Sequence, residues 1–166
     1  VVKHPEVAVG QWLKFVSDVG KIATGKADER SAEPSDKRFT DPAWKSSPLH
    51  HAILQSYLAW ADAISTYVEK IELNEHDRAR AKLITGVLVD ALAPTNALFG
   101  NPAALKKLVD TGGESLWSGL KNYLSDLVEN GGMPSQVDGR PFKVGKNLAT
   151  TPGAVVFRDK MFELIQ

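Results

Sequence analysis

The stretch "SPLHHAILQSYLAWADAISTYVEK" (47–70) decides the fold, because it predicts one long central helix. Ser47 is a favourable N-cap residue, and Pro48 suits the first turn, where a backbone N–H has no partner within the helix. Apolar residues recur at the spacing of one helix face. They are Leu49, Ile53, Tyr57, Ala61, Ile64, Val68 and Ile71, and Leu54, Leu58 and Tyr67 widen the stripe. We therefore expect this helix to contact neighbours on more than one side.

The residues before this helix predict a second amphipathic helix and a linker. Residues 5–24 place Val9, Trp12, Leu13, Val16 and Val19 on one face. Residues 25–37 are polar and contain no large apolar residue, so they predict a flexible linker.

In the segment 38–48, Phe39, Pro42 and Trp44 alternate with polar residues, and Pro48 ends the segment. This pattern predicts an extended arm that docks Phe39 and Trp44 onto a surface. We expect two parts of the chain here. They are residues 1–35, an N-terminal helix with its linker, and residues 36–166, the main helical domain.

Three more helices are predicted after residue 70. Asn74 caps the first of them, Asn101 caps a short second one, and the third covers about residues 114–130. The expected buried stripe of the first is Ala79, Leu83, Val87 and Ala91. The expected buried residues of the third are Leu116, Leu120, Tyr123, Leu124, Leu127 and Val128. The pattern predicts helix packing throughout this part of the chain.

The last residues, "FKVGKNLATTPGAVVFRDKMFELIQ" (142–166), have a different pattern. Phe142, Val144 and the run 154–157 favour strands, with a turn at Thr151-Pro152-Gly153. We expect these strands to pair across that turn or with a sheet outside this chain. The fold class is therefore mainly α, a helical domain of about four to five helices with a short β-like segment at the C-terminal end.

Composition excludes several classes of function. The formal net charge is +0, which gives no electrostatic argument for nucleic acid or an acidic membrane surface. The chain has 0 cysteines, so it cannot form a disulfide, a thiolate metal site or a thiol nucleophile. No secretory signal is visible, and a start at Val suggests a piece of a longer chain.

No pattern of catalytic or metal-binding residues is visible. The 4 histidines lack the spacing of metal ligands, and we predict neither a metal nor a cofactor. The serine in "GGESLWSGL" lies within a helical pattern and not in a strand-to-helix elbow. The 4 tryptophans either pack in the core or cover an interface, where Trp is enriched. For the interface we select Val9, Trp12, Val16, Phe39 and Trp44.

Four segments carry a resemblance. They are "DKRFTDPAW" (36–44), "APTNALFGNPAAL" (93–105), "TGGESLWSGLKNYLSDL" (111–127) and the C-terminal stretch 142–166. Together, and in this order, they resemble the N-terminal domain of poly(3-hydroxyalkanoate) synthases, also called polyhydroxybutyrate polymerases. A small difference is Gly100, where the family often has Thr before Asn-Pro.

The resemblance implies a longer acyltransferase. An α/β-hydrolase-type catalytic domain is expected after residue 166, with a Cys nucleophile and His and Asp partners. That domain is expected to polymerise 3-hydroxyacyl-coenzyme A and to release coenzyme A. The present segment is then inactive alone, and the acyl-coenzyme A binds only to the missing domain.

For this segment the resemblance implies contact roles. They are dimerisation, attachment to cytoplasmic polyester granules and their associated proteins, and support of the catalytic domain. The alternative is a free-standing helical module that binds a protein partner through an exposed apolar face.

Overall fold

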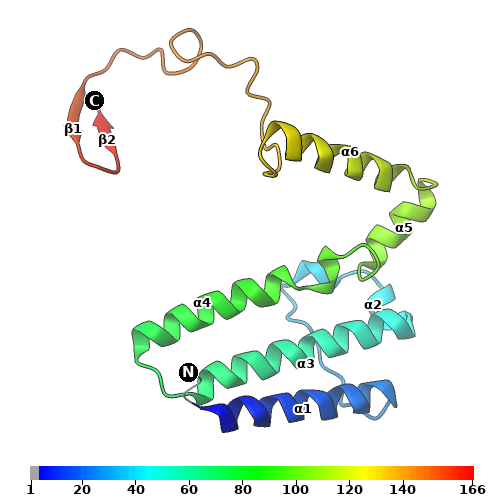
Figure 1. The fold of residues 1–166 in the computed structure, drawn as a ribbon. Coiled ribbons are helices and arrows are strands. Elements are labelled where there is room, and N and C mark those ends of the chain that lie inside the picture. Colours follow the sequence, from blue (N-terminus) through cyan, green and yellow to red (C-terminus); the bar gives the residue numbers. More distant parts are fainter. Residues whose placement is uncertain (1–3) are drawn as a thin grey trace. The chain divides into compact units, whose positions relative to one another are not determined.

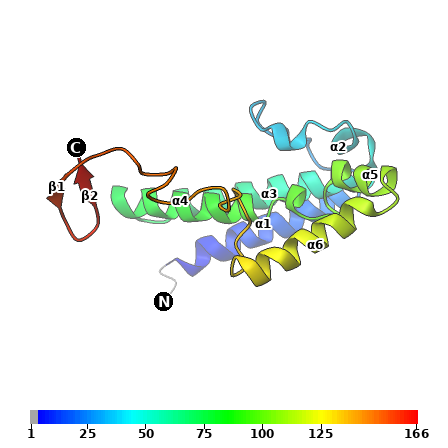
Figure 2. The ribbon, with the colours of Figure 1, turned by 90° about the horizontal axis from the view of Figure 1, so that it is seen from above.

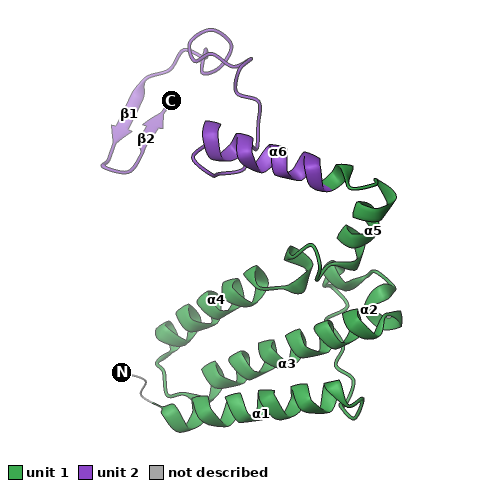
Figure 3. Ribbon diagram, turned by 45° about the vertical axis from the view of Figure 1, so that its right-hand side comes forward, with its two compact units in different colours: residues 1–115 green, residues 116–166 purple. Residues whose placement is uncertain are grey.

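The computed structural model describes residues 4–166. The chain divides into two compact units, Val1–Ser115 and Leu116–Gln166 (Figure 3). In order, the elements are α1 (Pro5–Ala23), η1 (Lys37–Phe39), α2 (Ala43–Ser46), α3 (Pro48–Lys70), α4 (Glu75–Ala91), η2 (Pro94–Asn96), α5 (Pro102–Asp110), α6 (Glu114–Glu129), β1 (Val155–Arg158) and β2 (Glu163–Ile165). The predicted fold class is confirmed: the described residues form six α-helices, one more than the upper prediction because of the four-residue α2, and two short strands.

Helix α3 is the centre of the first unit, as its sequence predicts. The hydroxyl of Ser47 accepts a hydrogen bond from the backbone N–H of His50, and Pro48 occupies the first turn. Helices α1 and α4 lie on either side of α3, and α2 packs against it as well (Figures 1 and 2). Its buried residues are His50, Leu54, Gln55, Tyr57, Ala59, Ala63 and Val68. They lie on two roughly opposite faces of the helix, so α3 contacts neighbours on more than one side.

The predicted helix starts are confirmed by their caps. The side chain of Asn74 accepts from the N–H of Asp77 at 2.8 Å at the start of α4. The side chain of Asn101 accepts from the N–H of Ala103 at 3.0 Å at the start of α5. Both are short polar side chains that satisfy backbone donors of a first helical turn. These ends are decided locally, within three residues of the cap.

The predicted packing face of α4 is wrong. Leu83 and Val87, of the predicted stripe, are 69% and 61% exposed. The half-buried positions of α4 are Arg78, Ala81, Thr85 and Val89. The guanidinium of Arg78 donates to the carbonyls of Val68, Glu69 and Ile71 at the end of α3. The carbonyls at the C-terminal end of a helix carry partial negative charge and favour a nearby cation. The contact of Arg78 with this end of α3 orients the smaller side chains of α4 toward α3.

Residues 25–36 do not form a free linker in the structure. The backbone N–H of Arg30 donates to Gln55 Oε1 at 2.8 Å, and Gln55 Nε2 donates back to the Arg30 carbonyl at 2.7 Å. Arg30 also pairs with Asp18 of α1 at 2.6 Å. These polar contacts fasten the segment to α3 and α1. Helix α1 is thus part of the first compact unit, which extends to Ser115.

The expected extended arm at 38–48 is instead helical, because it contains η1, α2 and the start of α3. Asp36 caps η1 through the N–H of Arg38, and Asp41 accepts from the N–H of Ala43 at 2.8 Å. Local aspartate caps thus outweigh the two prolines that suggested an extended backbone.

A close approach lies just before α5. A Cβ on Gly100 would be 2.5 Å from the carbonyl oxygen of Pro94, which is a backbone atom and cannot swing aside. The absence of a side chain at position 100 therefore matters in this chain.

In the second unit, the prediction that α6 buries its apolar residues is wrong. Leu116, Leu120, Leu124 and Leu127 are all exposed, as are the remaining members of the predicted set. The helix ends at Gly131 and Gly132, both with positive φ, as expected for a glycine stop. The apolar stripe is present in the sequence, but no described residue covers it.

The C-terminal strands pair with each other. β1 and β2 are antiparallel, with Val155 opposite Ile165 and Arg158 opposite Glu163. The chain reverses at 159–162, where the N–H of Asp159 donates to the Phe162 carbonyl at 2.9 Å. The expected turn at 151–153 is therefore wrong, and the partner of β1 is the apolar C-terminal end itself.

Two glycine-containing segments precede this hairpin. Gly153 lies beside the last residue, where an added Cβ would be 2.9 Å from the Gln166 carbonyl oxygen. Phe142 and Val144 belong to no strand, and a bridge joins Val144 to Leu148 in a compact turn. Alternation around Phe142 and Val144 is too short to define a strand.

Candidate interaction surface

The five residues selected from the sequence lie in two different environments. Val9, Trp12 and Val16 are exposed on α1. Phe39 is half-buried, and Trp44 is buried. The structure thus leaves the α1 residues free for contact, whereas Trp44 is not accessible.

Trp44 is the centre of an aromatic cluster in the first unit. Its ring meets Phe39 edge-on at 5.1 Å between centroids and His50 at 5.8 Å. Phe39 also contacts Tyr57, and Tyr57 contacts Trp60. Edge-on aromatic contacts and complete burial stabilise a fold strongly. Of the two interpretations of the tryptophans, core packing fits Trp44.

Helix α1 packs on α3 mainly through residues that the sequence pattern did not select, and of the predicted face only Val19 is half-buried. Gln11 is buried, and Phe15 and Asp18 on the same face are half-buried. The selected apolar face, with Val9 and Trp12, lies beside this packing face and toward solvent. A polar Gln in an apolar contact has no sequence signature, so it could not be found in advance.

A groove of about 190 Å³ runs between α1 and α3. Gln11, Trp12 and Phe15 contribute from α1, Trp60 and Tyr67 contribute from α3, and small or aliphatic side chains complete the lining. The rings of Trp12 and Phe15 lie 5.7 Å apart. Lys14 of α1 and Asp62 of α3 form an ion pair at 2.7 Å that helps hold the helices together. The groove is therefore a defined apolar depression within one compact unit.

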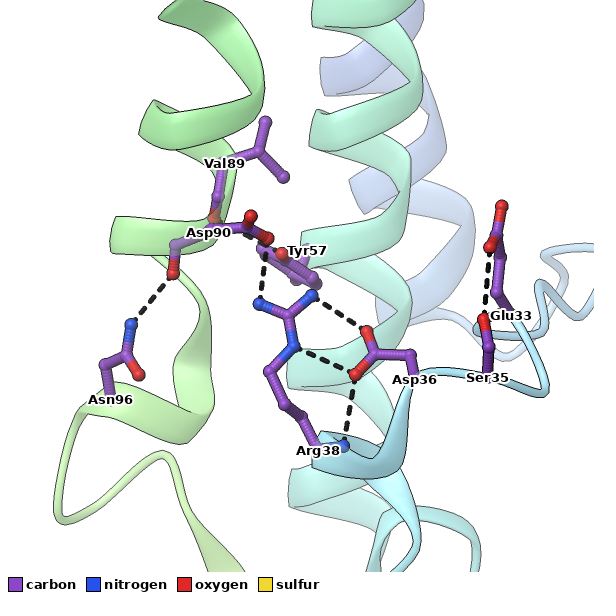
Figure 4. A network of polar contacts seen from close by, with 8 residues as sticks. All are labelled: Glu33, Ser35, Asp36, Arg38, Tyr57, Val89, Asp90 and Asn96. Carbon is purple, nitrogen blue, oxygen red and sulfur yellow. Dashed lines mark hydrogen bonds and ion pairs between the residues drawn. The ribbon is translucent and has the colours of Figure 1, made fainter. Parts of the chain in front are cut away.

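A polar network joins η1 to α3 and α4 (Figure 4). Arg38 donates to both carboxylate oxygens of Asp36, at 2.9 and 2.8 Å, and to Asp90 at 2.9 Å. Tyr57 donates its hydroxyl hydrogen to the Val89 carbonyl at 3.2 Å. The hydrogen bonds that Arg38 donates to the carboxylate of Asp36 lower the pKa of Asp36 below its usual value and raise the pKa of Arg38.

The same network affects Tyr57, whose pKa is raised mainly because burial disfavours the phenolate. These groups pair with one another and with a backbone carbonyl of α4. The network therefore acts as a structural link between three elements.

Within residues 4–166, no cluster of three or more His, Cys, Asp or Glu side chains could hold a metal ion. Over the same residues, no helix has the length and apolar character needed to cross a lipid bilayer.

Comparison with known proteins decides the family. The family described as "Poly-beta-hydroxybutyrate polymerase (PhaC) N-terminus" matches residues 35–166. The chain belongs to this family. The sequence resemblance is thereby confirmed, and α1 lies outside the residues that the family matches.

Individual relatives extend the similarity to α1. Poly(3-hydroxyalkanoate) polymerase 1 of Ectopseudomonas oleovorans is 42% identical over 165 residues, which is 99% of this chain and 29% of that protein. Poly(3-hydroxyalkanoate) polymerase subunit PhaC of Cupriavidus necator is 37% identical over 145 residues, which is 87% of this chain and 24% of that protein. The chain thus spans less than a third of the length of these relatives. No solved structure matches it significantly.

Proposed function

We propose that the chain is the non-catalytic N-terminal domain of a poly(3-hydroxyalkanoate) polymerase. The observation that carries this proposal is its alignment, over 99% of its length, with 29% of a curated polymerase. The chain contains 0 cysteines, so the thiol nucleophile implied by the resemblance has to come from another part of the polymerase. Polymerisation of 3-hydroxyacyl-coenzyme A then belongs to the complete enzyme.

The proposed roles of the domain are contact roles. Helix α4 exposes Leu83, Ile84 and Val87, and α6 exposes Leu120 and Leu124. Large apolar side chains that are exposed together on one helix favour contact with a partner surface. Both helices lie within the residues that the family matches, so support of the catalytic domain is the role we assign to them.

Two further contacts are assigned to the domain as a whole. They are dimerisation of the polymerase and attachment to the surface of polyester granules and to their associated proteins in the cytoplasm. The exposed α1 residues Val9, Trp12 and Val16 are the proposed granule contact. Phe39 remains a weaker candidate because it is half-buried, and Trp44 supports the fold instead.

The first test is the coding sequence beyond Gln166. A hydrolase-type G-x-C-x-G further along supports the proposal, and a stop codon at that point contradicts it and favours the free-standing module.

The second test is co-sedimentation of the chain with polyester granules, with and without residues 1–35. Because the exposed α1 residues lie within the deleted part, their role requires weaker sedimentation of the shortened chain. The matched control is the substitution Leu83→Ala on α4, which leaves α1 unchanged. Equal sedimentation with and without α1 would contradict its role in granule contact.

A further inference from the structure

The groove between α1 and α3 combines aromatic walls with one unsatisfied polar atom. Trp12, Phe15 and Trp60 supply most of the wall, and the volume is about 190 Å³. An apolar depression with a single buried polar group suits a short alkyl segment that carries a small polar group.

Gln11 is the unusual residue of this lining. Its side chain is 9% exposed, and among residues 4–166 its Oε1 has no hydrogen-bond partner. A buried acceptor without a partner costs free energy, because it has lost water and gained nothing. The terminal torsion of glutamine is broad, so a turn of the amide brings Oε1 toward a donor that enters the groove. The groove therefore favours a ligand that carries a hydrogen-bond donor.

The charge of the lining narrows the ligand further. No lining residue of the groove is ionisable at neutral pH, and the other side chains with a hydrogen-bonding group are Tyr67 and the indoles of Trp12 and Trp60. Lys14, on the same helix, is already paired with Asp62. A carboxylate or a phosphate-rich coenzyme would have no cation here to offset its desolvation. The ligand is thus an uncharged apolar chain with a donor such as a hydroxyl.

We propose that this groove binds the hydroxyl end of a 3-hydroxyalkanoate ester chain, with Gln11 Oε1 accepting the hydroxyl hydrogen. In such a polyester every other hydroxyl is consumed in an ester bond, so only the chain end offers this donor. The alkyl side group of the last unit packs between Trp12 and Trp60. The choice of ligand rests on the proposed function, because relatives of this chain are named for that polymer.

The test compares two esters that differ only in the hydroxyl group, methyl 3-hydroxyhexanoate and methyl hexanoate. Each is titrated into the 166-residue chain while the indole N–H signals of its 4 tryptophans are followed by NMR. The signals are assigned with single Trp→Phe variants. Trp12 and Trp60 line the groove, whereas Trp44 is buried elsewhere and Trp117 lies on α6.

The proposal predicts saturable shifts of the Trp12 and Trp60 signals and unchanged Trp44 and Trp117 signals. The hydroxy ester binds about two- to tenfold more tightly than the plain ester, which is the range of one net hydrogen bond. In the variant Gln11→Leu this preference disappears while binding of the plain ester persists. The variant keeps an apolar side chain of similar size, so the groove is retained.

Three outcomes would overturn the proposal: equal affinity for both esters, shifts that centre on Trp117, or no saturable shift at all. Each leaves the coding-sequence test of the polymerase assignment untouched, since that test does not depend on the groove. Conversely, selective binding of the hydroxy ester would support the site even if a stop codon after Gln166 contradicted the polymerase assignment.

Discussion

Replacing Trp44 by alanine tests whether the aromatic cluster holds the first compact unit together. Trp44 is 1% exposed and contacts Phe39 and His50 edge-on. Truncating a fully buried Trp removes its transfer free energy and leaves a cavity, at a cost of about 3–5 kcal/mol. A domain of this size is stable by about 5–15 kcal/mol, so the variant loses a large fraction of its free energy of unfolding.

Urea denaturation followed by circular dichroism measures this loss. The matched control is Trp12→Ala, which removes the same side chain from the same compact unit at a position that is 62% exposed. We expect the control to lose about 1 kcal/mol or less, since most of its ring is already in water. If Trp44→Ala and Trp12→Ala were destabilised equally, the assignment of Trp44 to the core would be refuted.

Three further predictions follow from single positions. Gly100→Thr places a Cβ 2.5 Å from a backbone carbonyl, so we expect urea denaturation to show a loss of about 1–3 kcal/mol, whereas Gly86→Ala, with free space around it, is stabilised. The lowered pKa of Asp36 contributes stability above the unfolded pKa that is lost as the pH falls through the folded value. Arg38→Gln should therefore flatten the pH dependence of the urea midpoint below about pH 4, and an unchanged slope would contradict this. Gly153→Val crowds the C-terminal carbonyl at 2.9 Å, and we expect faster amide hydrogen exchange across the hairpin, which protection at the wild-type level would disprove.

Helix limits and family membership could be predicted from the sequence because they depend on residues that are neighbours in the chain. Ser47, Asn74 and Asn101 each cap a helix by bonding a backbone N–H at most three residues away. The long motifs that carry the family resemblance are likewise contiguous and do not depend on packing. Near the C-terminus, the β-branched run correctly indicated β structure, but its partner strand was not identified.

The tertiary structure alone decided which helix faces are buried. Helices α1 and α4 each carry two candidate faces, and periodicity cannot choose between them. Nonlocal polar contacts accompany the choice. On α4, Arg78 reaches the last carbonyls of α3. On α1, Asp18 pairs with Arg30, whose backbone is held by Gln55 of α3. Gln11 cannot be predicted as a site residue from the sequence. Its side-chain oxygen becomes a buried acceptor without a partner only because α3 packs over it. Local chemistry therefore fixed where the helices begin and end, and long-range hydrogen bonding fixed what they bury and what they expose.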